Sequence, residues 1–135
     1  MCIGDAYTIG DVLLQVSQPR RPCWKISRRW QIDDLSDRVK NTGRTGWYFR
    51  VLKEGFIETG LLVVLFERPY PQWTINCAYG VMKNSRSDPQ AAQELAACHL
   101  LSVHWRTKLV ETKRWDIVKE GVKGFVRKFK IDNIV

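Results

Sequence analysis

The run SQPRRPCWK, residues 17–25, decides how this chain of 135 residues is organised. It follows residues 12–16 (VLLQV), whose apolar alternation predicts a β-strand. Pro19 and Pro22 each fix a backbone φ angle and remove an amide donor, so we expect a stiff loop that ends the strand and cannot join a ladder centrally. The loop leads to a single thiol, Cys23, which is followed directly by Trp24.

The thiol of Cys23 is the first candidate for chemistry. Arg20, Arg21 and Lys25 flank it in the sequence. Neighbouring cations favour the thiolate, which is the form that attacks electrophiles and binds soft or high-valent metals. A free cysteine is also common as a small buried hydrophobic residue. The residues alone leave both interpretations open.

The same loop resembles the cysteine loop of the MOSC family, the C-terminal domains of molybdenum-cofactor sulfurases. Two further segments agree with the family in order, CIGD (residues 2–5) upstream and GRTGWYFRVL (residues 43–52) downstream. The later PQWTI (residues 71–75) resembles the start of the three-helix module that follows the barrel in YiiM-type MOSC proteins. Proteins of this type carry a further N-terminal portion of the barrel, so the resemblance implies that this chain holds the C-terminal portion.

The resemblance implies a site for the molybdenum cofactor, molybdopterin. The family's corresponding cysteine is the proposed molybdenum ligand or sulfur carrier, which makes Cys23 the expected catalytic residue and metal ligand. The cofactor carries a phosphate or a nucleotide pyrophosphate, and guanidinium groups match such oxygens bidentately. Arg20 and Arg44 lie inside the matched segments and are the expected phosphate ligands. Trp24, which can stack on a flat pterin, and Thr45 in the glycine-flanked turn complete the predicted cofactor-binding set.

The basic and aromatic residues around this site also have a plainer interpretation. Residues 20–50 hold nine basic side chains against three acidic ones. Charges on solvated helix faces explain Arg28, Arg29, Arg38 and Lys40 without any ligand. Aromatic residues on a strand are most often part of a core, and we expect that for Trp47 and Phe49.

The resemblance implies a function as an oxidoreductase. The reaction would be the two-electron reduction of N-hydroxylated compounds such as hydroxylamino bases, with electrons from a redox partner protein. Two alternatives come from other classes: a non-catalytic sulfur-carrier or nucleic-acid-binding module, and an inactive truncated product. The net charge of +8 and the basic residues between 106 and 130 favour anionic partners. No residue set in that segment points to base readout, so nucleic acid is not the favoured partner.

The predicted fold class is mixed β and α. We expect a partial MOSC-type β-barrel with short helices over residues 1–68, a three-helix module over 69–115, and a basic C-terminal tail or helix over 116–135. The run RPYP, residues 68–71, marks the first boundary because two prolines in three residues make an abrupt connector. Strands are predicted at 2–9, 12–16, 47–52 and 61–67, and the last is apolar on both faces, so we expect it to be buried on both. Helices are predicted at 24–30, 33–41, 74–83, 88–98 and 102–115.

Composition sets the remaining bounds. A hydrophobic content of 44% supports a packed core. The sequence has no apolar run of 18 residues and no signal-peptide pattern at its start. Its four cysteines are scattered without zinc spacing, which favours a reduced, cytoplasmic protein. Strand edges at the front of the partial barrel favour pairing with another chain, so a homodimer is one expected arrangement.

Overall fold

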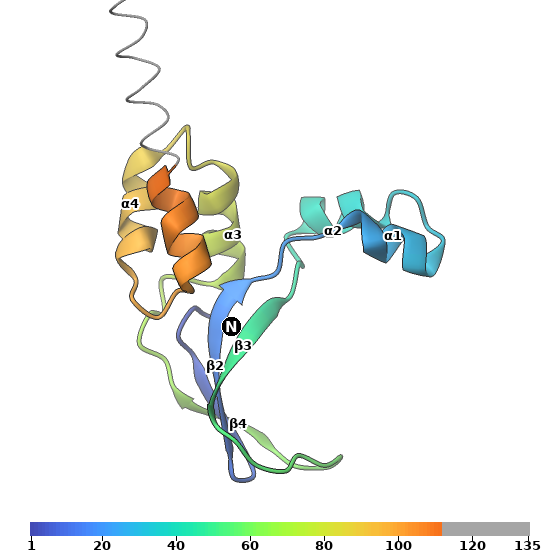
Figure 1. Ribbon diagram of the computed structural model, residues 1–135, viewed down its shortest axis with the longest axis vertical. Coiled ribbons are helices and arrows are strands. Elements are labelled where there is room, and N and C mark those ends of the chain that lie inside the picture. Colours follow the sequence, from blue (N-terminus) through green and yellow to red (C-terminus); the bar gives the residue numbers. More distant parts are fainter. Residues whose placement is uncertain (112–135) are drawn as a thin grey trace, which may run out of the picture.

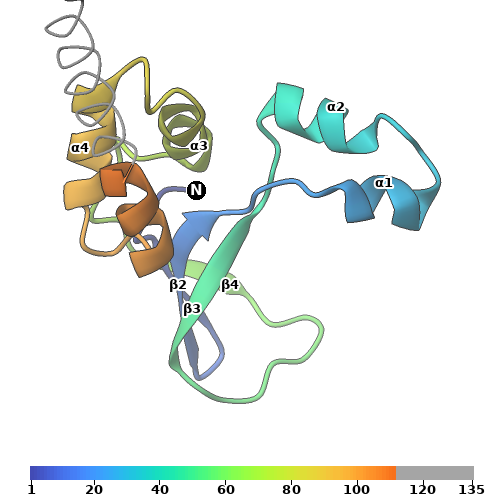
Figure 2. The same cartoon turned by 45° about the horizontal axis from the view of Figure 1, so that its top comes forward.

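The computed structural model describes residues 1–111 and has the mixed β and α fold that the sequence predicts. A four-stranded antiparallel sheet has the strand order β3-β2-β1-β4. A lobe of two short helices, α1 (Trp24–Trp30) and α2 (Leu35–Thr42), connects β2 to β3 and extends away from one end of the sheet, and a helical module packs beside the sheet (Figures 1 and 2). The predicted tail over 116–135 lies outside the described residues. The predicted domain boundaries stay a prediction.

The hairpin of β1 (Ala6–Ile9) and β2 (Val12–Pro19) forms the centre of the sheet. Regular pairing in β1 begins later than expected, because Gly4 has a φ of +83° and turns the chain. In contrast, β2 runs three residues beyond the predicted end at Val16. Pro19 is tolerated there because it is the last residue of the strand, opposite Trp47 of β3, where a missing amide costs little.

The lobe between β2 and β3 follows the predicted helices closely. Helix α1 spans Trp24–Trp30 and has no buried residue, and α2 spans Leu35–Thr42. The amide of Ser36 donates to Oγ of Ser27 over 2.9 Å and links the two helices. Helix α2 ends at Gly43 in the left-handed conformation (φ +67°), which glycine adopts without a Cβ penalty.

Burial of the outer strands differs from the prediction. Strand β4 spans Val63–Glu67, and every residue in it is exposed, so the expectation of burial on both faces is wrong. The reason is that β4 is an edge strand, paired only with β1, and no layer of the described residues covers it. Strand β3 (Trp47–Lys53) is exposed throughout as well. Trp47 and Phe49, which we expected in the core, keep 39% and 40% of their surface exposed.

The helical module supplies the core. Helix α3 (Ile75–Lys83) begins at Thr74, whose Oγ1 accepts a hydrogen bond from the amide of Cys77. Helix α4 (Pro89–Ala97) begins at Asp88, with proline at its first position. Residues 103–111 form a further helix. Its Trp105 packs with residues of the sheet and of the other helices in one buried cluster, which includes Ile3, Val16, Ile75, Ala78, Leu95 and Leu101. Among residues 1–111, no helix combines the length and apolarity that crossing a bilayer requires.

An ion pair between a buried carboxylate and an exposed guanidinium group ties the first residues to the connector that leads into the helical module. The carboxylate of Asp5 is fully buried and accepts hydrogen bonds from Nε and Nη2 of Arg68, both over 2.9 Å. The amide of Cys2 and the hydroxyl of Tyr7 also donate to this carboxylate. Burial by itself would raise the pKa of Asp5, but these hydrogen bonds and the charge of Arg68 together lower it.

Candidate cofactor-binding site

The cysteine loop and the glycine-flanked turn meet at one end of the sheet. Pro19, the last residue of β2, lies opposite Trp47, the first residue of β3. One residue further out, the amide of Arg20 donates to the carbonyl of Gly46 over 2.8 Å. This backbone contact holds the segment that leads to Cys23 beside the turn that contains Arg44 and Thr45. Three of the predicted cofactor-binding residues, Arg20, Arg44 and Thr45, therefore lie on adjoining segments.

Cys23 is the residue that precedes α1. Its backbone is extended (φ −129°, ψ 148°), and its carbonyl accepts the amide of Ile26 in the first helical turn. The thiol is free and half-buried. Across residues 1–111, no three His, Cys, Asp or Glu side chains gather closely enough to hold a metal ion. A metal at Cys23 would therefore depend on ligands brought by a cofactor, rather than on a set of protein ligands from this part of the chain.

The turn over residues 43–46 borders a cavity of about 480 Å³. Arg44 is exposed at its rim, and Thr45 is almost fully buried, with Oγ1 donating to the carbonyl of Gly46. Gly46 has a φ of +76°, and nothing occupies the space where a Cβ would project. The cavity thus joins one guanidinium group with an open stretch of glycine backbone, a combination suited to an anion.

Helix α3 forms the opposite wall of this cavity. Thr74, Ile75 and Asn76 line it together with the turn, and a Cβ on Gly43 would collide with Oδ1 of Asn76. The sequence interpretation missed Asn76 because this residue belongs to the helical module, far from the turn along the chain. A glycine at Gly43 indicates a close approach, but nothing in the sequence says which residue approaches.

Trp24 belongs to a different groove. Its indole is 59% exposed, and Cζ of Arg28 lies 5.8 Å from the ring centroid. Trp24, Lys25, Arg28 and Arg29 line an open groove of about 420 Å³ on α1. The structure therefore brings Arg20 to the turn of Arg44 and Thr45, whereas Trp24 contributes to a separate basic and aromatic surface beside Cys23.

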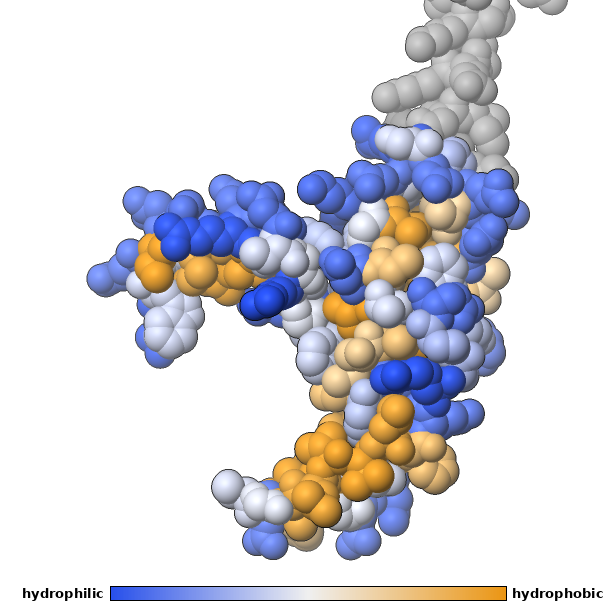
Figure 3. All heavy atoms as spheres, turned by 180° about the vertical axis from the view of Figure 1, so that it is seen from behind, coloured by the Kyte–Doolittle hydropathy of each residue, from blue (hydrophilic) through white to orange (hydrophobic). Residues whose placement is uncertain are grey.

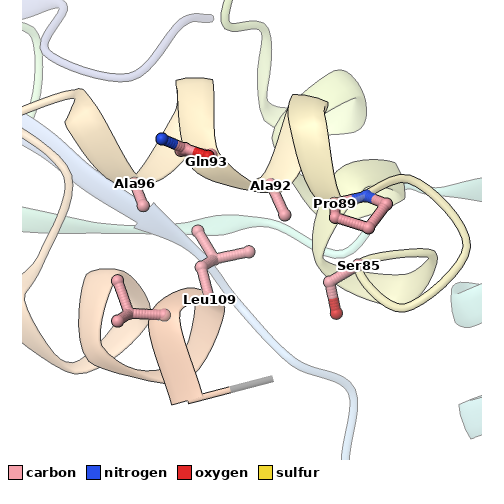
Figure 4. A pocket seen from close by; sticks show the side chains of 7 residues that line it. Ser85, Pro89, Ala92, Gln93, Ala96 and Leu109 are labelled. Carbon is pink, nitrogen blue, oxygen red and sulfur yellow. The ribbon is translucent and has the colours of Figure 1, made fainter. Parts of the chain in front are cut away.

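A third cavity lies within the helical module, between α4 and the helix of residues 103–111 (Figure 4). It measures about 180 Å³ and is lined by Ser85, Pro89, Ala92, Gln93, Ala96, Leu109 and Val110. None of these side chains carries a charge, so this cavity lacks the cations that a phosphorylated ligand requires.

Three comparisons identify proteins that this chain is similar to. Residues 1–64 match the model of the MOSC domain. A stretch of 76 residues is 50% identical to a protein from Gibberella moniliformis named "Reductase", and it covers 56% of this chain and 14% of that protein. The uncharacterized protein YflK from Bacillus subtilis is 31% identical over 113 residues, which are 84% of this chain and 51% of YflK.

A solved structure shows the same arrangement. The crystal structure of YiiM from Geobacillus stearothermophilus superposes with a TM-score of 0.79 at 38% identity, over 83% of this chain and 57% of that chain. The chain spans about half the length of YflK and a much smaller share of the fungal protein.

Proposed function

Because this chain belongs to the MOSC domain family, we propose that it binds a molybdenum cofactor and takes part in the two-electron reduction of N-hydroxylated compounds such as hydroxylamino bases. The observation that supports this most is the junction at the end of the sheet. There the hydrogen bond from the amide of Arg20 to the carbonyl of Gly46 holds the cysteine loop beside the cavity that Arg44 lines, which is suited to an anion.

The residues at the junction fit such a cofactor chemically. A half-buried thiol is a soft donor that suits molybdenum, and Cys23 would be the protein's ligand to the metal. Arg20 and Arg44 would bind the phosphate of the pterin, since arginine pairs bidentately with phosphate oxygens. The positive φ of Gly46 leaves the backbone of the turn open on the side where such a phosphate would lie.

When bound, the cofactor supplies the two-electron oxygen-transfer chemistry, and the chain supplies binding and orientation. Arg44 would neutralise the phosphate at the rim of the cavity. Thr45 is held by the carbonyl of Gly46, which keeps the turn in the conformation that the cavity needs. Trp24 would offer a flat apolar face next to Cys23, on which a planar substrate stacks in the separate groove of α1.

We propose that a partner redox protein delivers the electrons. The support is the fungal relative, whose printed name is "Reductase" and in which the segment similar to this chain makes up only 14% of the length. Most of that protein lies outside the match and has room for further functions. We also propose a cytoplasmic location, because all four cysteines are free thiols, as a reducing compartment would keep them.

A nucleic-acid-binding module is the second candidate function. Trp24 and Trp30 are 59% and 69% exposed on α1 beside Arg28, and exposed aromatic rings with cations are the usual platform for single-stranded nucleic acid. A salt titration with single-stranded DNA separates the candidates. Tight binding with a steep salt dependence, lost in Trp24→Ala but kept in Cys23→Ala, would favour this second function.

Activity of the metal-loaded protein tests the first candidate. A hydroxylamino base would serve as the substrate and a chemical reductant as the electron source, with the wild type compared with Cys23→Ala and Cys77→Ala. Cys77 is exposed on α3 and provides the matched control. We expect Cys23→Ala to lose at least about 100-fold in rate, because losing a metal ligand should cost more than losing a group that orients one, which costs about 10–100-fold. We expect Cys77→Ala to keep the wild-type rate. Equal rates in all three proteins would contradict the role of Cys23.

A further inference from the structure

Helix α1 carries a strip of aromatic and basic side chains that the proposed phosphate site does not use. Residues four apart on a helix share a face, so Trp24 lies next to Arg28 and Lys25 next to Arg29. All four are exposed, and together they line the groove of about 420 Å³ on α1. Figure 3 shows the lobe of α1 and α2 projecting to the left, away from the rest of the described molecule. The groove is therefore accessible to a ligand.

The positive charge of this groove is not neutralised within the part of the chain that the structure describes. On the neighbouring helix α2, Arg38 and Lys40 each form an ion pair with an aspartate three or four residues before them. No ion pair among residues 1–111 involves Lys25, Arg28 or Arg29. Charges of one sign along a groove raise the local concentration of a ligand of the opposite sign. The groove on α1 therefore favours a ligand with several negative charges.

The aromatic ring narrows the class of ligand. The indole of Trp24 is 59% exposed, and Cζ of Arg28 lies 5.8 Å from its centroid, so a flat apolar face and a cation are within reach of one molecule. A nucleoside phosphate combines a flat base with several negative charges. The groove of about 420 Å³ has room for one such molecule, because small-molecule sites measure about 300–1,000 Å³.

The position of the second tryptophan on α1 distinguishes a single nucleotide from a nucleic-acid strand. Trp30 is 69% exposed but does not line the groove. It lies six positions after Trp24, which at 3.6 residues per turn places the two side chains about 120° apart around the helix axis. A strand stacks successive bases on rings that form one platform, and these two rings do not. We propose that the groove on α1 binds one nucleoside phosphate, with its base on Trp24 and its phosphates on the three cations.

The groove also lies beside the candidate metal ligand. Cys23 directly precedes Trp24, so a base stacked on the indole would lie close to the thiol. If the chain reduces hydroxylamino bases, their nucleotide forms would then be better substrates than the free bases. This consequence rests on the proposed function, whereas nucleotide binding itself requires no metal.

Calorimetric titration of the full chain, prepared without molybdenum, tests the binding with ATP, AMP and adenosine as probes. We expect the affinity to fall from ATP through AMP to adenosine, because each phosphate lost removes charge that the cations attract, and to weaken as salt is added. Because no metal and no reduction are involved, binding stands even if the proposed enzymatic function fails. Adenosine binding as tightly as ATP, or no binding of ATP at millimolar concentration, would overturn the proposal.

Matched variants locate the binding on α1. We expect Trp24→Ala to weaken ATP binding at least about fivefold, the low end of what one stacked base contributes, and Arg28→Ala to weaken it on a similar scale. Trp24→Phe keeps a ring and should restore most of the affinity. Trp30→Ala and Arg38→Ala remove exposed side chains of the same types outside the groove and should bind ATP as the wild type does. Because α1 has no buried residue, these variants should fold, and circular dichroism checks this.

A single-stranded oligonucleotide is the last probe. If the groove holds one nucleotide, Trp24→Ala loses affinity for ATP and Trp30→Ala does not. Unchanged ATP binding in Trp24→Ala would overturn the proposal. Equal losses in Trp24→Ala and Trp30→Ala, with the oligonucleotide bound more tightly than ATP, would also overturn it and would assign the surface to a nucleic-acid strand.

Discussion

The central strands and the outer strands of the sheet contain the same kinds of apolar residues, but only the central strands are covered. In the central strands β1 and β2, Tyr7 and Val16 pack with helices α3 and α4 and are almost fully buried. On the outer strands, Val63, Val64 and Phe66 are as apolar but lie exposed. The difference shows that apolar, β-branched sequence is sufficient to form a strand, whereas burial depends on which layer is present to cover it.

Truncating one aromatic residue in the core and one on an outer strand would test this comparison with the largest effect. Trp105→Ala removes a ring that is 1% exposed in the core, and we expect a loss of about 3–5 kcal/mol in the free energy of unfolding. Phe66→Ala removes a ring that is 69% exposed on β4, and we expect a change of about 0.5 kcal/mol or less. Urea unfolding of both variants measures the contrast, and similar losses would show that β4 is already covered in the isolated chain.

The ion pair of Asp5 and Arg68 extends the comparison from apolar residues to charged ones. Asp5→Ala leaves the buried hydrogen-bond donors of Cys2 and Tyr7 without their acceptor, so we expect a loss of about 2–3 kcal/mol at neutral pH. Asp37→Ala, which removes an exposed ion pair with Lys40 on α2, is the matched control and should leave stability nearly unchanged. Thermal unfolding of both variants provides the measurement.

The same pair gives stability a defined pH dependence. The folded pKa of Asp5 lies below its ordinary value of 3.8, so the unfolded chain takes up a proton first as the pH falls. The stabilisation is therefore complete above pH 3.8 and is lost as the pH drops through the folded pKa. We expect the difference between the wild type and Asp5→Ala to shrink below pH 3.8. A difference that stays constant down to pH 2 would contradict the assignment.

Local signals allowed most elements to be predicted from the sequence. Asp88 and Pro89 correctly predicted the start of α4, and Gly43 the end of α2, because helix caps depend only on neighbouring residues. Long-range features escaped prediction. The exposure of β4 depends on strand order, and the approach of Asn76 to Gly43 depends on how the helical module packs.

The sequence predicted which segments form the candidate site, but not how these segments are arranged in space. The family resemblance selected the cysteine loop and the turn of Arg44 before their contact was known, and the bond from Arg20 to Gly46 now joins them. Trp24 was expected in the same site, but it lines a groove of its own on α1. Side-chain direction at the start of a short helix decides that difference, and the sequence pattern does not carry it.

Molybdenum content per chain tests the central claim most directly. Wild type, Cys23→Ala and Cys77→Ala would be produced with cofactor supply and analysed for metal after purification. The account predicts molybdenum in the wild type and in Cys77→Ala and its loss in Cys23→Ala. Equal molybdenum in Cys23→Ala and the wild type, or none in the wild type, would contradict it.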